Sequence, residues 1–271
     1  MLTIKDLSFG YNSKMPIISD LSMTVDGGTV CGLLGRNGAG KSTLLYLICG
    51  LLKPSKGTID YNGRTPFDRS VPFLQDVFMV PEEFGLPSVS LDDYIKVNEP
   101  FYPKFDRDLM NRCLDIFELS PNLNLGELSL GQKKKVYISF AMACNTSLVV
   151  LDEPTNGLDI SAKRNFRKVV VESMNDDKCI IISTHQVYDV DKILDHVIIT
   201  DRKGILFNGG IDKISSQYRF GFTTDAERAA KALIALDVPG GMNIAEPLFD
   251  PNDETEVNLE TFFELIQQKN R

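Results

Sequence analysis

The sequence lacks paired cysteines, long apolar runs and an excess of basic side chains, and each absence excludes a class of protein. Its 271 residues include 5 cysteines, and none of them forms a CxxC pair that could bind a metal or act in redox chemistry. Most of them lie in apolar runs, where a free thiol acts as a small hydrophobic side chain. Because the set is odd in number and unpaired, we expect a reducing compartment.

No segment is apolar enough to predict a transmembrane helix. No window approaches ~18 uncharged apolar residues, the length that crosses a bilayer. The segment from Met1 to Phe9 has the pattern of a strand and lacks the basic and then apolar parts of a signal peptide. We therefore expect a cytoplasmic protein that reaches a membrane only through a partner.

The charge balance is acidic, with 29 Lys and Arg against 37 Asp and Glu and a formal net charge of −8. A protein that binds nucleic acid by broad neutralisation of phosphates needs the opposite sign, so we expect no nucleic-acid partner. A small local basic site for a phosphorylated ligand is still compatible with this balance. The hydrophobic content of 43% is typical of globular proteins, and the length allows one large domain or two small ones.

Short apolar segments alternate with segments of helical periodicity, which favours an α/β fold with a mostly parallel sheet. Continuous apolar runs at 147–151 and 179–182 are typical of strands buried on both faces. The other expected strands are 2–7, 17–25, 30–34, 57–61 and 77–80. The expected helices are 42–52, one that Asp106 caps, 161–173, 225–236 and 259–269, with a linker at 239–241.

A phosphate-binding loop is the strongest motif. Gly35-Arg36-Asn37-Gly38-Ala39-Gly40-Lys41-Ser42 fits G-x-x-x-x-G-K-[ST] and lies between an expected strand and an expected helix. Glycines allow consecutive backbone N–H groups to turn toward one anion, and the start of the helix adds its positive dipole end. The motif predicts that Lys41 reaches the β- and γ-phosphates and that the Ser42 hydroxyl holds Mg²⁺.

Two adjacent carboxylates, Asp152 and Glu153, follow the buried run 147–151. Open α/β sheets bind ligands at this end of their strands. We expect Asp152 to support Mg²⁺ and Glu153 to polarise an attacking water as a general base.

A second anion site is predicted where Leu128-Ser129-Leu130-Gly131-Gln132 precedes three lysines, Lys133 to Lys135. Ser129 and Gln132 have the spacing of a capping box, so a helix with free N–H groups should begin here. We expect the three lysines to reinforce its positive potential. Since one nucleotide does not need two phosphate cradles, two chains facing each other would use both.

Together these motifs resemble the ATP-binding subunits of ABC transporters. Leu128 to Gln132 is similar to the signature LSGGQ, with Leu130 in place of the first glycine, and Asn156 to Asp159 is similar to the D-loop. His185 follows a buried strand as the switch histidine does, and Tyr11 lies where members stack an aromatic ring on adenine. The Gln-Lys-Lys-Lys run and Phe101-Tyr102-Pro103 suggest the exporter-type bacterial ATPases.

The resemblance implies a P-loop NTPase of the α/β class with a mostly parallel core sheet, an antiparallel β subdomain, a helical insertion and a small C-terminal α+β extension. It covers residues 1–215, the ATP-binding domain, with the insertion at about 83–145, and leaves 216–271 as the extension. The residues expected to act in catalysis are Lys41, Glu153 and His185, and those expected to hold Mg²⁺ are Ser42, Asp152 and Glu82. The residues expected at ATP are Tyr11, Gly35, Asn37, Gly38, Ala39, Gly40, Lys41, Ser42, Thr43, Ser129, Gly131, Gln132 and Asp159.

One departure from the family concerns Glu82, which stands where members usually have a glutamine. Its carboxylate can still ligand Mg²⁺ or water, but it adds a negative charge near an anionic phosphate, which the metal must screen. Phe101 and Tyr102 form either a docking surface for the permease or a folded-in loop. His196 is expected to be structural.

The implied function is that of an ATPase subunit. ATP would close a dimer of two copies, hydrolysis would release it, and a separate integral-membrane permease would convert this cycle into transport. The alternatives are a non-transport ABC ATPase, for example in iron–sulfur assembly, and an ATP-binding module without turnover. The transported substrate, its direction and the role of residues 216–271 do not follow from the sequence.

Overall fold

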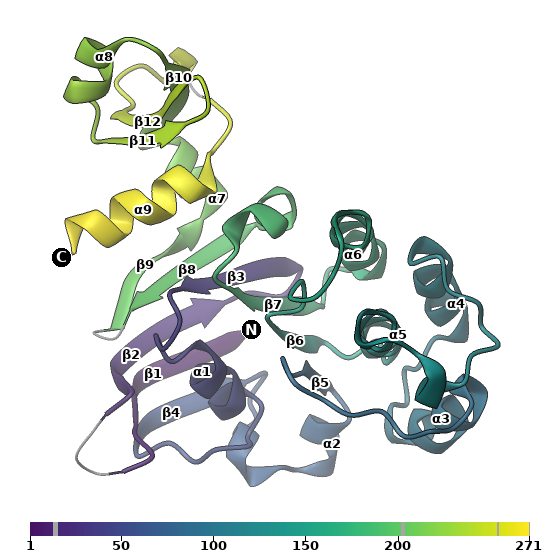
Figure 1. Ribbon diagram of the computed structural model, residues 1–271. Helices are drawn as coiled ribbons and strands as arrows, with labels where there is room; N and C mark the ends of the chain where they lie inside the picture. Colours follow the sequence, from purple (N-terminus) through teal and green to yellow (C-terminus); the bar gives the residue numbers. More distant parts are fainter. Residues whose placement is uncertain (13–15, 202–203, 254, 271) are drawn as a thin grey trace.

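A six-stranded sheet forms the centre of the computed structural model, which describes residues 1–12, 16–201, 204–253 and 255–270 (Figure 1). The strands lie in the order β5 (Val77–Val80), β6 (Leu148–Asp152), β7 (Cys179–Thr184), β3 (Thr29–Gly35), β8 (His196–Asp201) and β9 (Gly204–Gly210). The first five run parallel to one another, and only β9 pairs antiparallel with its neighbour. The expected mostly parallel sheet is confirmed.

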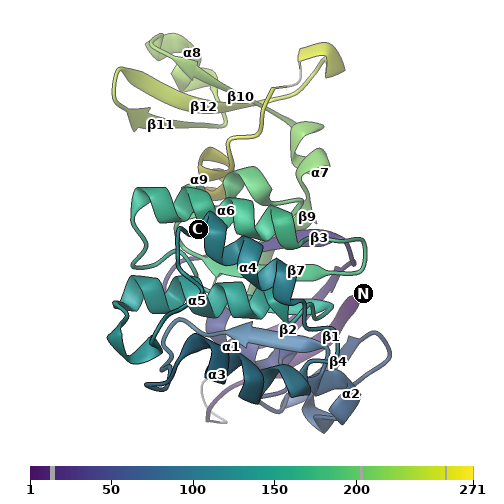
Figure 2. The ribbon, with the colours of Figure 1, turned by 90° about the vertical axis from the view of Figure 1, so that its right-hand side faces the viewer.

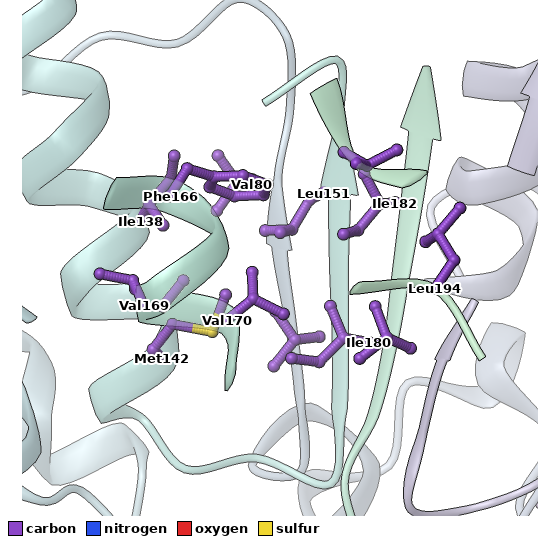
Figure 3. Close-up of a cluster of buried hydrophobic side chains, with 14 of the residues drawn as sticks. Val80, Ile138, Met142, Leu151, Phe166, Val169, Val170, Ile180, Ile182 and Leu194 are labelled. Atoms are coloured by element: carbon purple, nitrogen blue, oxygen red, sulfur yellow. The ribbon is translucent and has the colours of Figure 1, made fainter. Parts of the chain in front are cut away.

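The central strands are buried on both faces, as their continuous apolar sequences predict. β6 directs Val149 and Leu151 into one core cluster and Leu148 and Val150 into the other. Figure 3 shows the first cluster, in which Leu151 lies opposite side chains of the covering helices. The helices on this face are α4 (Arg107–Ile116), α5 (Leu130–Ala143) and α6 (Ile160–Ser173), and they lie side by side in Figure 2.

An antiparallel sheet lies on the other side of the core. Its order is β2 (Ile18–Val25), β1 (Leu2–Phe9) and β4 (Lys56–Tyr61). Together with α1 (Lys41–Ile48) it encloses the second core cluster. The antiparallel β subdomain is therefore confirmed.

The remaining helices of this part are short. They are α2 (Val71–Leu74) and α3 (Leu91–Asn98), with 3₁₀ turns at Pro66–Asp68, Glu99–Phe101, Leu125–Glu127, Val187–Asp189 and Asp191–Ile193. The Asp106 side chain accepts a hydrogen bond from the backbone N–H of Leu109 at 2.9 Å, so it caps α4 as predicted. α1 ends at Ile48 rather than at 52, because Gly50 takes a φ of +68° that a helix cannot continue through.

The C-terminal segment forms a small separate sheet. It contains α7 (Ile211–Ser215), β10 (Tyr218–Thr223), α8 (Ala226–Lys231), β11 (Ile234–Val238), β12 (Gly241–Pro247), a 3₁₀ turn at Pro251–Asp253 and α9 (Leu259–Lys269), with the strand order β10-β12-β11. α9 packs Phe262 against Phe207 of β9 and Tyr218 of β10, with ring centroids 4.8 and 5.5 Å apart. The last helix thus joins the small sheet to the edge of the large one.

Two predictions for this segment are wrong. The helix expected at 225–236 ends at Lys231, and its last part is strand β11. Ile234, Leu236 and Val238 are less exposed than the residues between them, which is the period of a strand rather than of a helix. The linker expected at 239–241 is the tight turn between β11 and β12, where Gly240 adopts a φ of +89°.

All five cysteines are free and buried: Cys31, Cys49, Cys113, Cys144 and Cys179. Burial raises the pKa of every one of these thiols, to about 12 for Cys49, Cys113 and Cys179. Within the described ranges, no helix combines the length and apolar character needed to cross a membrane.

One buried charge is costly to the fold. Lys178, just before β7, is 1% exposed, and its ammonium donates no hydrogen bond to any described residue. Burial lowers the pKa of Lys178 from 10.5 to about 8. The difference between these values corresponds to roughly 3 kcal/mol of penalty for the charged form.

We predict that Lys178→Met raises the free energy of unfolding by about 1–3 kcal/mol at pH 7. The unfolded chain binds this proton between pH 8 and 10.5 while the native state does not, so the wild type regains stability as the pH rises through that window. The increase in the free energy of unfolding that Lys178→Met causes is therefore complete below pH 8 and absent above pH 10.5. Urea titrations at several pH values measure it. Two results would contradict this account. One is a difference in the free energy of unfolding between Lys178→Met and the wild type that is as large at pH 10.5 as at pH 7. The other is an increase in the free energy of unfolding from Lys168→Met, the control at an exposed site.

Candidate nucleotide-binding and catalytic site

Three neighbouring strands end at the same edge of the large sheet, and most of the predicted site residues follow them. β3 leads into the phosphate loop, β6 into Asp152 and Glu153, and β7 into His185. Because these strands are parallel and in register, with Asp152 opposite Ser183, residues that are far apart in the sequence meet at this edge. The sheet is therefore what assembles the site.

The phosphate loop has the predicted strand–loop–helix context. α1 begins at Lys41 directly after Gly40, whose φ of +85° only glycine adopts without strain. An added Cβ at Gly40 would also stand 3.0 Å from the side chain of Ile17. Around this turn Asn37 and Gly38 are exposed, Ala39 and Thr43 are buried, and Ser42 is half-buried. The first turn of α1 contains no acidic residue, so its N–H groups and dipole favour an anion.

Glu153 is in direct contact with both Lys41 and His185. The Lys41 ammonium lies 2.8 Å from the Gly35 carbonyl oxygen, to which it donates, and 3.3 Å from Glu153 Oε1. The same carboxylate oxygen lies 2.9 Å from Nδ1 of His185, whose backbone N–H also points to Oε2 at 3.4 Å. Glu153 is 5% exposed and has a φ of +43°, and its own N–H donates to the Ser183 carbonyl oxygen at 3.1 Å. The carboxylate is thus held between a cation and an imidazole.

Asp152 lies beside this group and is 1% exposed. Its Oδ1 accepts a short hydrogen bond from the Ser183 hydroxyl. Burial raises the pKa of the Tyr46 phenol, and the carboxylates of Asp152 and Glu82 raise it further.

The donor set fits Mg²⁺ only together with phosphate. Ser42 offers a hydroxyl and Asp152 and Glu82 offer carboxylates, which are the oxygen ligands that Mg²⁺ prefers. Among the described residues, no three His, Cys, Asp or Glu side chains cluster so that they could hold a metal ion by themselves. Mg²⁺ typically takes one or two protein ligands and completes its shell with phosphate oxygens and water.

A chain of hydrogen bonds links Glu82 to the other two strand ends. Glu82 Oε1 accepts from Asn156 Nδ2 at 3.0 Å, and Asn156 Oδ1 accepts from Gln186 Nε2 at 3.1 Å. Gln186 Oε1 in turn accepts from the Lys163 ammonium at 3.1 Å. Glu82 therefore lies within a network that joins the exits of β5, β6 and β7. Sequence reasoning missed Asn156 as a side-chain bridge and missed Gln186 entirely, because neither carries a motif signal for this contact.

The predicted signature forms the expected helix start. The Ser129 hydroxyl accepts from the Gln132 N–H at 3.3 Å, and Gln132 Oε1 accepts from the Ser129 N–H at 3.0 Å. An added Cβ at Gly131 would stand 3.5 Å from the Gly157 carbonyl oxygen, so the signature lies beside the D-loop. Asp159 caps α6 by accepting from the Ala162 N–H at 2.7 Å. In the described part of the chain, no hydrogen bond joins Ser129, Gly131, Gln132 or Asp159 to the phosphate loop.

One of the three lysines, Lys134, behaves differently from the prediction. Lys134 is 4% exposed, and its ammonium donates to the carbonyl oxygens of Glu153 at 3.3 Å and Asn156 at 2.9 Å. It therefore does not reinforce the positive potential at the start of the helix. The helical spacing could have indicated this, because Lys134 shares a face with the buried residues Ile138 and Ala141.

Tyr11, expected at the adenine ring, lies at the periphery of the site, and so does a contact that the sequence did not predict. Tyr11 is 63% exposed and meets Phe9 edge-on at 5.1 Å, in a groove of about 540 Å³ at the end of β1. Arg36 of the phosphate loop lies 3.4 Å from Glu264 of α9, so the last helix contacts this loop. His196 lies away from the site and shares a hydrogen bond with Asn208 on β9.

Comparison with known proteins gives one consistent family. The family model described as ABC transporter matches residues 18–156. The chain is 32% identical to energy-coupling factor transporter ATP-binding protein EcfA1 of Mycoplasma pneumoniae, over 88% of this chain and 85% of that protein.

Solved structures agree with the sequence comparison. A structure titled as the ATP binding subunit of an ABC transporter has a TM-score of 0.72 and 28% identity, covering 79% of this chain and 91% of that one. The structure of cbiO1 from Clostridium perfringens, described as part of the ABC transporter complex cbiONQ, has a TM-score of 0.65 and 26% identity, covering 79% and 89%. The chain therefore belongs to the ABC transporter family, as an ATP-binding subunit with the P-loop NTPase fold.

Proposed function

We propose that this protein binds Mg²⁺–ATP between two copies of itself and hydrolyses it to drive a separate integral-membrane permease. The observation that carries the proposal is the contact of Glu153 with both Lys41 and His185 at the end of β6. It places a buried carboxylate, a phosphate-binding cation and an imidazole within reach of one reacting group.

The proposed chemistry assigns one task to each group. The loop amides and Lys41 neutralise the triphosphate, Glu153 accepts a proton from the attacking water, and His185 steadies the charge that develops on the γ-phosphate. Ser42, Asp152 and Glu82 are the residues proposed to hold Mg²⁺, which would help to neutralise the charge of the phosphates. The Ser183 hydroxyl holds the Asp152 carboxylate in place, and the Lys41 ammonium holds that of Glu153.

The second copy would supply Ser129, Gly131, Gln132 and Asp159 to the first. Two large apolar side chains flank these residues and face outward: Leu130 is 67% exposed and Ile160 is 89% exposed. Apolar surface of this kind, beside two helix starts, favours burial against another protein. The departure from the family at Leu130 therefore adds contact area at the proposed dimer interface.

The permease is proposed to bind in a groove of about 420 Å³ beside Phe101. Val71, Leu74 and Met79 contribute to its apolar lining, and Phe101 is 64% exposed at its edge. Tyr102 also lines this groove, and it is half-buried, with its ring centroid 5.4 Å from that of Phe78. Phe101 is the more exposed of the two adjacent aromatic residues, so it offers the larger free surface for docking. Binding there would hold the protein at the cytoplasmic face of the membrane.

We also propose that the ATP-binding domain ends near residue 215 and that residues 216–271 are an extension built on it. The small sheet β10-β12-β11 and the docking of α9 on β9 support this division. One relative, 29% identical, is named as the ATP-binding protein of a zinc uptake system, so the exporter-type assignment stays a prediction.

We predict that Glu153→Gln binds ATP and dimerises but hydrolyses it at least ~100-fold more slowly, because an amide cannot accept the proton. Phosphate release measures turnover, and light scattering with ATP measures the dimer. The exposed variant Glu227→Gln serves as the control and should keep full activity. Unchanged turnover in Glu153→Gln would refute the base assignment.

Lys41→Ala is expected to weaken ATP binding about 10–100-fold, since it removes a charged hydrogen-bond donor from the phosphates. Isothermal titration calorimetry checks this, with the exposed α6 variant Lys168→Ala as the matched control. If Lys41→Ala bound ATP as the wild type does, the phosphate-loop assignment would fall.

Phe101→Ser should raise the Kd for the permease about tenfold or more, since burying an exposed phenylalanine contributes about 1.5–3 kcal/mol. Val97→Ser, at a residue of α3 that is 68% exposed and does not line the groove, provides a matched control. Co-purification with the permease, and the Kd for immobilised permease, compare the two variants. Equal losses, or no loss in Phe101→Ser, would place the docking surface elsewhere.

A further inference from the structure

Lys134 has no role in the function described so far, although it lies in the site. It is on α5, five residues after the cap Ser129, and it is 4% exposed. A lysine this buried is costly unless its ammonium has partners. Burial lowers its pKa, and the charges of Glu82, Glu153 and Asp152 raise it again. The three carboxylates thus favour the charged form, against the larger effect of burial.

The partners of Lys134 are main-chain atoms of the turn that follows β6. Its ammonium donates to the carbonyl oxygens of Glu153 and Asn156, at 3.3 and 2.9 Å. These two residues begin and continue the turn that joins the proposed base to the D-loop. Because Glu153 has a φ of +43°, which is strained for a side chain other than glycine, an external contact on its carbonyl helps to hold it there.

Asn156 connects the same lysine to Glu82. The Asn156 carbonyl accepts from Lys134, and its side-chain amide donates to Glu82 Oε1 at 3.0 Å. Glu82, Asp152 and Glu153 bring three negative charges to this edge, against the ammonium groups of Lys41 and Lys134. The family usually has a neutral glutamine in place of Glu82, so Lys134 stands opposite an additional charge.

We propose that Lys134 is a positioning residue for ATP hydrolysis, which holds the turn carrying Glu153 and offsets the negative charge of Glu82. This inference rests on the proposed function. It explains how a glutamate can occupy a place beside the phosphates without repelling them. It also ties the helix that starts at the signature to the turn that carries the base, so a displacement of α5 is passed to Glu153.

Three variants separate the hydrogen bonds from the charge. Lys134→Met removes both, Lys134→Gln keeps amide donors without the charge, and Lys134→Gln with Glu82→Gln restores a neutral pair. Steady-state ATPase assays on the full chain give kcat and KM for each, and thermal melts report folding. The control is Lys168→Met, an exposed lysine in the middle of α6.

We expect Lys134→Met to lower kcat about 10–100-fold with KM for ATP changed less than about 3-fold, because the residue acts on the base and not on the phosphate loop. Lys134→Gln should lower kcat less than Lys134→Met does. Adding Glu82→Gln to Lys134→Gln should recover at least about 3-fold in kcat, although Glu82→Gln alone gives no such gain in the wild type. If Lys134→Met does not fold, the two glutamine variants carry the comparison.

A kcat within about twofold of the wild type in folded Lys134→Met and Lys134→Gln would overturn the proposal. The proposal would also be overturned if the fold-change in kcat of the double variant equalled the product of the fold-changes of Lys134→Gln and Glu82→Gln. A purely structural lysine predicts such independence. Glu153→Gln, measured in the same assay, distinguishes the two hypotheses. If it is inactive while the Lys134 variants are normal, only this inference fails, whereas full activity in Glu153→Gln defeats the proposed function itself.

Discussion

The parallel register of three strands is the constraint on which the rest of the site depends. β3, β6 and β7 are hydrogen-bonded neighbours, and their carboxyl ends deliver a phosphate loop, a pair of carboxylates and a histidine to one edge. A shift of one residue between β6 and β7 would turn Asp152 and Glu153 to the opposite faces of the sheet. The apolar side chains that fix this register, such as Leu151 and Ile182, therefore also determine the geometry of the polar groups that follow them (Figure 3).

The same edge concentrates charge in a place with little water. Lys41, Lys134, Asp152 and Glu153 are all less than 10% exposed. Removing such groups from water is expensive, and each is retained because it faces an opposite charge, a carbonyl or a hydroxyl. Lys178 shows the opposite case, a buried ammonium without such a partner among the described residues. The contrast separates charges that the site requires from one that the fold merely tolerates.

Much of this arrangement could be predicted from local sequence, and the failures have physical causes. The phosphate loop, the capping box and the apolar runs are local patterns whose spacing dictates backbone geometry, so the central strands and the start of α5 were predictable. The predicted helix 225–236 includes residues 234–236, which are strand, because the alternation there is short and weak. The contacts of Lys134 with Glu153 and Asn156, and of Arg36 with Glu264, join residues 19 to 228 positions apart, which no local pattern encodes.

The burial of every cysteine has a practical consequence. A thiol reacts with disulfides and alkylating reagents only as the thiolate, and a raised pKa makes that form scarce at neutral pH. The folded protein is thus inert to such labels, while each opening of the chain exposes a reactive sulfur. Cys31 and Cys179 lie in β3 and β7, Cys113 lies in α4, and Cys49 and Cys144 follow α1 and α5. Because these sites are spread over the molecule, mass spectrometry of alkylated peptides would resolve which parts open first and which stay closed until global unfolding.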